Sequence, residues 1–117
     1  MKKVKKILLR IAAAIAALIL AALIYVGIGR HRMDKLLHEH LSAQGYTDAD
    51  ISRYTISHSF LNRILSYPEW RIEVVFADEP DVVYEYGYWN GDVSQGSAHS
   101  DRIREKEDLF TLKHYEH

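Results

Sequence analysis

The stretch from Trp70 to Gly91, WRIEVVFADEPDVVYEYGYWNG, decides how the second part of this chain folds. Large apolar side chains occupy alternate positions in two runs: Trp70, Ile72, Val74 and Phe76, then Val82, Tyr84, Tyr86 and Tyr88. Because alternation with a period of two places side chains on one face of a strand, each run predicts a half-buried strand. Asn90-Gly91 is a residue pair that tight hairpin turns favour, so the second strand should turn back into a third.

The register of the first hairpin follows from the side chains that it would bring together. If the turn around residues 78–81 has two or four residues, Glu85 comes to lie opposite Val74 on the apolar face, which is costly for an unpaired carboxylate. A loop of three or five residues pairs the two apolar runs and puts the large rings on one face. We therefore expect an odd-numbered loop or a bulge.

Upstream of this stretch, the sequence predicts one further strand and one helix. Residues 54–60 alternate apolar and polar side chains, which indicates a strand, and residues 61–67 form a connector or helical turn closed by Pro68. Residues 33–44 place apolar side chains at helical spacing, and Gly45 suits the left-handed residue that ends a helix.

Downstream, the pattern is weaker. Residues 92–98 are a polar run that indicates an edge strand. Ser100 suits the N-cap of a last helix whose apolar stripe is poor, and we expect a weakly structured tail from about residue 100. The body therefore belongs to the α+β class, with one amphipathic helix packed on a three- or four-stranded antiparallel meander.

The N-terminal part of the chain predicts a transmembrane helix. Residues 11–29 carry no charge, and residues 7–9 extend this run past Arg10. About 20 apolar residues cross a hydrocarbon core of roughly 30 Å, so we assign residues 7–29 to the membrane after a basic cytoplasmic head at 1–6. The run is longer than the ~7–15 residues of a signal-peptide core. An uncleaved anchor is therefore favoured over a cleaved signal or the buried helix of a soluble protein.

The charge pattern sets the expected orientation and excludes one class of partner. Five positive residues precede the apolar run and three follow it closely, which favours a cytoplasmic N-terminus and an outer domain at residues 30–117. All 16 acidic residues lie in the second part of the chain, so we expect no nucleic-acid partner. Arg30 and Arg32 should lie near the lipid headgroups, and the acidic body should point away from them.

Two groups of side chains raise the question of a metal site. The chain has seven histidines and no cysteine, and no histidine pair has the spacing of the His-Glu-x-x-His zinc pattern. We interpret the histidines as solvated or strand-filling, with a transition-metal site as the alternative. Asp78, Glu79 and Asp81 form an acidic turn, which we interpret as a soluble polar turn, with a hard-cation site as the alternative. We therefore expect neither a metal nor a cofactor.

The aromatic stripe is the candidate binding site. It consists of Trp70, Tyr84, Tyr86, Tyr88 and Trp89. Tyrosine and tryptophan at this period fill the core of a small sheet, but they are also enriched where proteins bind partners. Trp89 falls on the opposite face of its strand from the tyrosines, so we expect at least one ring to be exposed.

Several segments also resemble a known family. They are Gly45-Tyr46, Tyr67-Pro68-Glu69-Trp70, the run from Val74 to Pro80, Tyr84-Glu85-Tyr86 and Asn90-Gly91. Together they are similar to domain-of-unknown-function family 3139, whose members are small Gram-positive proteins with a basic start, one membrane helix and a short outer domain. The resemblance implies architecture and location; it implies no site residue, because the family has no established activity. We expect the least agreement in the last strand and the tail.

The sequence carries no recognisable catalytic set. Nucleophile elbows, P-loops and dinucleotide-binding glycine patterns are absent, so we expect a protein that is not an enzyme. The first hypothesis is a membrane-anchored extracytoplasmic interaction module with a membrane or secreted protein partner, such as an accessory or immunity protein. The second is an extracytoplasmic sensor or inhibitor that binds a peptide or metal ion, and a hydrolase is a remote third.

Overall fold

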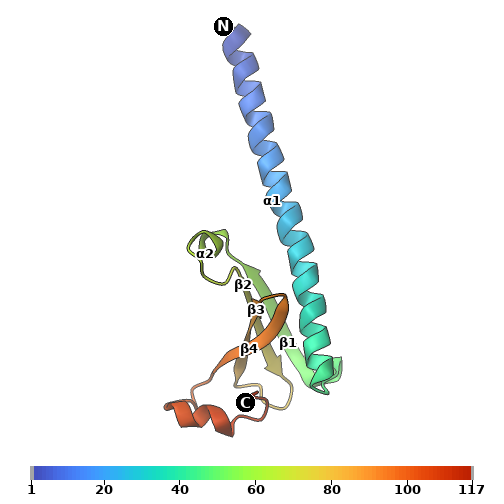
Figure 1. Ribbon diagram of the computed structural model, residues 1–117, viewed down its shortest axis with the longest axis vertical. Coiled ribbons are helices and arrows are strands. Elements are labelled where there is room, and N and C mark those ends of the chain that lie inside the picture. The colour runs from blue at the N-terminus through green and yellow to red at the C-terminus, as the bar shows by residue number, and fades with distance from the viewer. Residues whose placement is uncertain (1, 117) are drawn as a thin grey trace.

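The computed structural model describes residues 2–116 as a long helix followed by a small sheet domain (Figure 1). In chain order the elements are α1 (Lys2–Ala43), η1 (Asp48–Asp50), β1 (Ile51–His58), α2 (Phe60–Ile64), β2 (Trp70–Phe76), β3 (Val83–Trp89), β4 (Asp92–His99) and η2 (Lys106–Thr111). The α+β class is confirmed: one long helix lies against a four-stranded antiparallel sheet.

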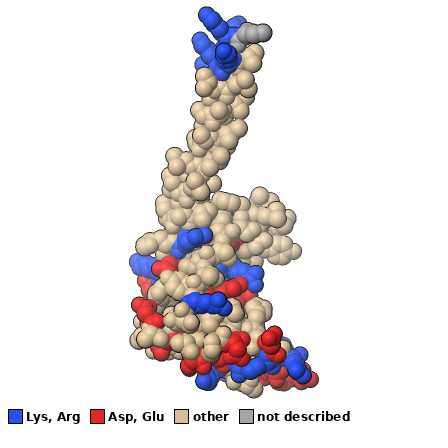
Figure 2. All heavy atoms as spheres, turned by 180° about the vertical axis from the view of Figure 1, so that it is seen from behind, with Lys and Arg blue, Asp and Glu red and all other residues tan. Residues whose placement is uncertain are grey.

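Helix α1 joins the apolar segment and the amphipathic segment without a break. It has 42 residues, and its first half projects beyond the sheet with every side chain from residue 2 to residue 21 exposed (Figure 1). This half is long and apolar enough to cross a membrane. Figure 2 shows the uncharged shaft between the basic N-terminal residues and the charged body.

The second half of α1 packs on the sheet. Met33, Leu37 and Leu41 recur at intervals of four residues, so they share one face, and all three are buried. The helix approaches the sheet closely at Gly29, where an added Cβ would lie 2.3 Å from Cζ2 of the Trp70 ring. Glycine at this position therefore allows α1 to continue directly from its apolar half into the core of the body.

The sheet follows the order β1-β2-β3-β4, so it is a meander with β1 and β4 at its edges. In the central hairpin, Ile72 pairs with Tyr86 and Val74 with Tyr84, which is the register predicted from the alternating rings. The Asn90-Gly91 turn is also confirmed, with positive φ at both residues (51° and 87°). The buried core, with partly buried neighbours omitted, consists of Met33, Leu37, Leu41, Trp70, Ile72, Val74, Phe76, Val82, Tyr84, Tyr86, Val93, Ala98 and Leu112.

The first strand and the tail differ from the expectation. β1 starts at Ile51, with a shift of register between Ile51 and Arg53, and it ends at His58, because Phe60 begins α2. In the tail, η2 is a 3₁₀ helix, and the residues after it return to the sheet, where Leu112 is buried. The helix expected from Ser100 is thus shorter, later and tighter than its sequence suggests.

Candidate interaction site

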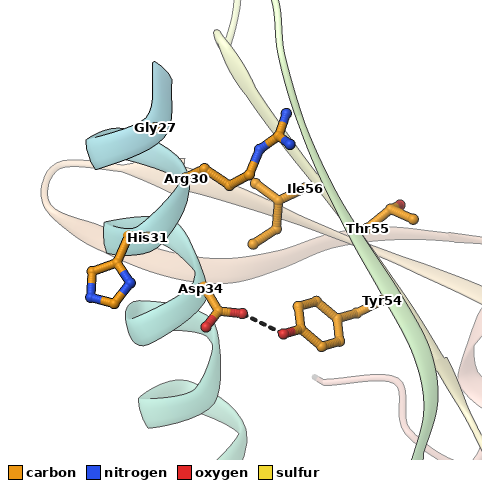
Figure 3. A pocket seen from close by; sticks show the side chains of 7 residues that line it. All are labelled: Gly27, Arg30, His31, Asp34, Tyr54, Thr55 and Ile56. Atoms are coloured by element: carbon orange, nitrogen blue, oxygen red, sulfur yellow. Dashed lines mark hydrogen bonds between the residues drawn. The ribbon is translucent and has the colours of Figure 1, made fainter. Parts of the chain in front are cut away.

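A groove runs between α1 and the edge strand β1, just beyond the apolar half of α1 (Figure 3). Its volume is about 580 Å³ and it is open to solvent. The lining residues are Gly27, Arg30, His31, Asp34, Tyr54, Thr55 and Ile56. The first four lie on successive turns of α1, and the other three occupy consecutive positions of β1. The groove therefore forms only because α1 packs on the sheet.

One end of the groove is closed by a bond between its two walls. The Tyr54 hydroxyl donates to Oδ1 of Asp34 at 2.5 Å, as Figure 3 shows. His38 packs edge-on against the Tyr54 ring at 5.3 Å and its Nδ1 contacts the backbone oxygen of Asp34 at 2.8 Å. The hydrogen bond to the Asp34 carboxylate, with some burial, raises the pKa of Tyr54 above its ordinary value of 10. Tyr54 therefore remains a neutral donor at physiological pH.

The other part of the groove contains two polar side chains that form no ion pair within the part of the chain that the structure describes. Arg30 extends from α1 toward β1, and His31 lies one position further along the helix (Figure 3). Among residues 2–116, neither side chain has an ion pair within 4 Å. β1 pairs only with β2, so the backbone groups on its outer side have no strand partner. A free strand edge beside a free cation is suited to an extended peptide with an acidic group.

The residues of the predicted aromatic stripe are divided between core and surface. Trp70, Tyr84 and Tyr86 are at most 4% exposed, so they fill the core beneath α1. Tyr88 is half-buried with the Arg32 guanidinium 5.7 Å from its ring centre, and Trp89 is 66% exposed. Three of the five rings therefore offer almost no surface to a partner, and the expectation of at least one exposed ring is met by Trp89.

A second polar cluster lies at the end of the sheet farthest from the apolar half of α1. Glu79 is only 3% exposed, so the prediction of a soluble polar turn is wrong for this residue. Its carboxylate accepts hydrogen bonds from the Tyr84 hydroxyl, from Arg102 Nη2 at 3.0 Å and from the backbone N–H of Lys113 at 3.2 Å. Burial and the Glu79 carboxylate raise the pKa of Tyr84 far above its ordinary value. Glu79 therefore fastens the tail to the β2–β3 turn.

His114 completes this second cluster. Its ring stacks on Phe76 at 4.0 Å between centroids, and its Nε2 lies 2.6 Å from Oδ1 of Asp78. Its Nδ1 lies 2.7 Å from the Tyr46 hydroxyl. Sequence reasoning missed this cluster because the tail residues Arg102, Lys113 and His114 lie 23 to 68 positions from these partners, and no local spacing predicts such contacts.

Five of the six histidines among residues 2–116, all except His31, are paired with carboxylates. The pairs are His38 with Asp34 and Asp48, His40 with Glu116, His58 with Glu69, His99 with Glu85, and His114 with Asp78. Among the described residues, no group of three or more histidine and acidic side chains is arranged to hold a metal ion. These pairs connect neighbouring elements of the fold.

The family model for a protein of unknown function, DUF3139, matches residues 1–86 of this chain. The chain belongs to the DUF3139 family. No curated protein and no solved structure matches the chain.

The DUF3139 match contains the whole groove but only part of the second polar cluster. It contains α1, β1, β2 and the greater part of β3, and therefore the whole groove and Glu79. It ends before β4 and the tail, so Arg102, Lys113 and His114 lie outside it. The groove is thus built entirely from the part of the chain that the DUF3139 model describes, whereas the tail contacts use residues beyond it.

Proposed function

We propose that this protein is a non-catalytic, membrane-anchored interaction module whose body lies outside the cytoplasmic membrane and binds a membrane or secreted protein. The observation that carries the proposal is the groove between α1 and β1, where the free strand edge lies beside Arg30 directly after the apolar half of α1. A partner that presents an extended segment at the membrane surface would meet both features.

The contacts around the groove support binding rather than turnover. Asp34 and Tyr54 are bonded to each other, and His38 is held against both. Side chains that serve as acids, bases or nucleophiles need to face a substrate, whereas these are engaged in joining the helix to the sheet. Arg30 and His31 remain available as a cation and a hydrogen-bonding ring, which suits recognition of a carboxylate.

The proposed orientation rests on charge. The excess of positive residues before the apolar run favours a cytoplasmic N-terminus, so the sheet would lie outside. An accessory or immunity protein that acts beside a secreted toxin of a Gram-positive cell is one concrete form of such a module.

Orientation is tested by labelling a single cysteine, because the native chain has none. Lys106→Cys lies on an exposed position of η2, and Lys3→Cys lies in the basic head. In intact cells, a membrane-impermeant maleimide should label Lys106→Cys and leave Lys3→Cys unlabelled until the cells are opened. The reverse pattern would contradict an outer body.

Partner binding is tested by photo-crosslinking from defined positions in native membranes. A photoreactive residue at Thr55 or His31 in the groove should yield one product with one protein, and the same residue at Lys106 should not. The Arg30→Glu variant should weaken the groove product severalfold, because it reverses the free cation. Equal crosslinking from all three positions would exclude the groove as the binding site.

A peptide sensor is a second candidate, because the same free β1 edge suits a short secreted peptide. In that case the crosslinked product would be a peptide of low mass. The Thr55→Pro variant, which bends the strand edge, should abolish that product, whereas a substitution on the β4 edge, such as Ser94→Pro, should leave it intact.

A further inference from the structure

The loop between β1 and β2 carries an exposed apolar surface, which we call the α2 patch. Its five residues have large exposed fractions: Phe60 46%, Leu61 63%, Ile64 79%, Leu65 54% and Tyr67 64%. An exposed apolar surface on a small domain indicates a site that contacts another protein or a membrane. The patch is separate from the groove, since none of its residues lines that groove.

Several backbone groups of this loop are paired within the loop. Ser59 caps α2 by accepting from the backbone N–H of Asn62 at 3.2 Å. The N–H of Tyr67 donates to the Asn62 carbonyl at 2.8 Å, and the N–H of Leu65 donates to the Leu61 carbonyl at 3.0 Å. Backbone groups that are already paired can enter a region poor in water at little cost, and this requirement excludes most irregular loops.

The α2 patch lies at the level where α1 leaves the membrane. The Tyr25 ring on α1 is 6.1 Å from the Phe60 ring, and its hydroxyl donates to Glu69 at 3.0 Å. About 20 helical residues cross the hydrocarbon core, so a span that starts at Ile7 ends at Val26, and one that starts at Ile11 ends at Arg30. In the first case Tyr25 lies one residue from the end of the span, and in the second it lies five residues, about 7.5 Å, inside that end, so the patch beside it lies within about 8 Å of the boundary between hydrocarbon and headgroups.

The surroundings of the patch have the composition of a membrane interface. Figure 1 shows α2 at the end of the sheet that points toward the N-terminal half of α1, and the β3–β4 turn lies at this same end. That turn exposes Trp89, and tryptophan and tyrosine favour the headgroup region. Arg63 on α2 is paired with Glu69 at 2.8 Å, but its side chain is 61% exposed and can also reach lipid phosphates. In Figure 2 acidic side chains are concentrated on the body, away from the apolar shaft.

We propose that the α2 patch inserts into the headgroup region of the same bilayer that α1 crosses. The body would then be held to the membrane at two places, the helix and the patch, with the groove facing sideways along the membrane surface. This inference requires that α1 spans the bilayer and is independent of the partner-binding proposal.

The test uses the full chain in vesicles of phosphatidylethanolamine and phosphatidylglycerol in equal parts. A nitroxide spin label is attached to Ile64→Cys, with Leu61→Cys as a second site and Lys106→Cys as the control at the far end of the body. Ile64 and Leu61 are so exposed that their replacement leaves the core intact. The ratio of oxygen to water-soluble nickel-chelate accessibility should be severalfold higher at 64 and 61 than at 106.

Two results would overturn the proposal. A water-like ratio at both 64 and 61 would mean that the patch stays in solvent. A high ratio that disappears when the protein is diluted in lipid would mean that a second copy covers the patch. A ratio that stays high at every dilution supports insertion, whatever partner the groove is found to bind.

Discussion

At the end of the sheet nearest the apolar half of α1, Glu69 accepts hydrogen bonds from Tyr25, His58 and Arg63. At the opposite end, Glu79 accepts them from Tyr84, Arg102 and the backbone of Lys113. The two carboxylates differ in burial, because the Glu69 side chain is 17% exposed and that of Glu79 only 3%.

Because the two carboxylates differ in burial, they join distant segments of the chain in different ways. Glu69 connects α1, β1 and α2 while keeping contact with water, and two of its three partners, Tyr25 and Arg63, are exposed, so its removal leaves only the buried His58 ring without a partner or water. Glu79 joins the tail to the core where water is excluded, so its removal leaves the Tyr84 hydroxyl without an acceptor. The far end of the sheet therefore depends more strongly on a single side chain.

The largest effect is expected from Glu79→Ala. The variant should lower the free energy of unfolding by about 2–4 kcal/mol, because it orphans a buried hydroxyl and frees the tail. Urea unfolding of the full chain in detergent micelles, followed by tryptophan fluorescence, measures this loss. Glu79→Gln keeps an acceptor for Tyr84 and should cost clearly less. Equal losses for both variants would show that negative charge, and not hydrogen bonding, matters there.

The next effect distinguishes two glycines on α1. Gly29→Ala should destabilise the body by about 1–3 kcal/mol, because the new methyl group would overlap the Trp70 ring. Gly27→Ala is the matched control, since a Cβ there meets nothing within 4 Å, and its better helix propensity should leave stability equal or slightly higher. The same urea titration compares them. Similar values would mean that the helix approaches the sheet less closely than described.

A smaller effect is expected where α1 meets the loop between β1 and β2. Tyr25→Phe removes the hydroxyl that donates to Glu69 but keeps the ring against Phe60, so it should cost about 1 kcal/mol. Amide hydrogen exchange should show faster opening near α2 with little change near η2. Uniformly faster exchange over the whole body would contradict a local role for this bond.

The smallest expected effect is a dependence of stability on pH in the acid range, caused by Glu69. Burial opposes ionisation of Glu69, but hydrogen bonds from His58, Tyr25 and Arg63 outweigh it, so its pKa lies below the ordinary value of 4.5. A lowered pKa contributes stability that is complete above pH 4.5 and is lost as the pH falls through the folded value. The contribution should be below about 1 kcal/mol, because Arg63 is exposed. Melting temperatures measured against pH should fall less steeply in acid for Glu69→Gln.

The sequence predicts the parts of the fold that depend on local periodicity. The parity of the hairpin register follows from rings at alternate positions, since only an odd-numbered loop or a bulge puts Tyr84 and Tyr86 on the same face as Ile72 and Val74. The continuous α1 follows in the same way from its apolar run and the spacing of Met33, Leu37 and Leu41.

Long-range polar contacts could not be predicted from spacing. Glu79 looks like any residue of a turn until Arg102 and Lys113 are brought to it from 23 and 34 positions away. The groove was also missed, because Arg30 and Tyr54 come from separate elements and meet only when α1 crosses the sheet. The aromatic stripe was overvalued as a surface because burial depends on what covers a face, and α1 covers most of this one.

The unbroken course of α1 has a mechanical consequence. Helix α1 runs from Lys2 to Ala43 without a hinge, so it behaves as a rigid lever. Its C-terminal half is packed on the sheet at Gly29, Met33 and Leu37. If α1 crosses a bilayer as proposed above, a change in the tilt of its apolar half, as a thicker or thinner bilayer imposes, swings the whole body by the same angle. The thickness of the membrane would thus set the orientation of the groove relative to the membrane plane, while the contacts inside the body stay the same.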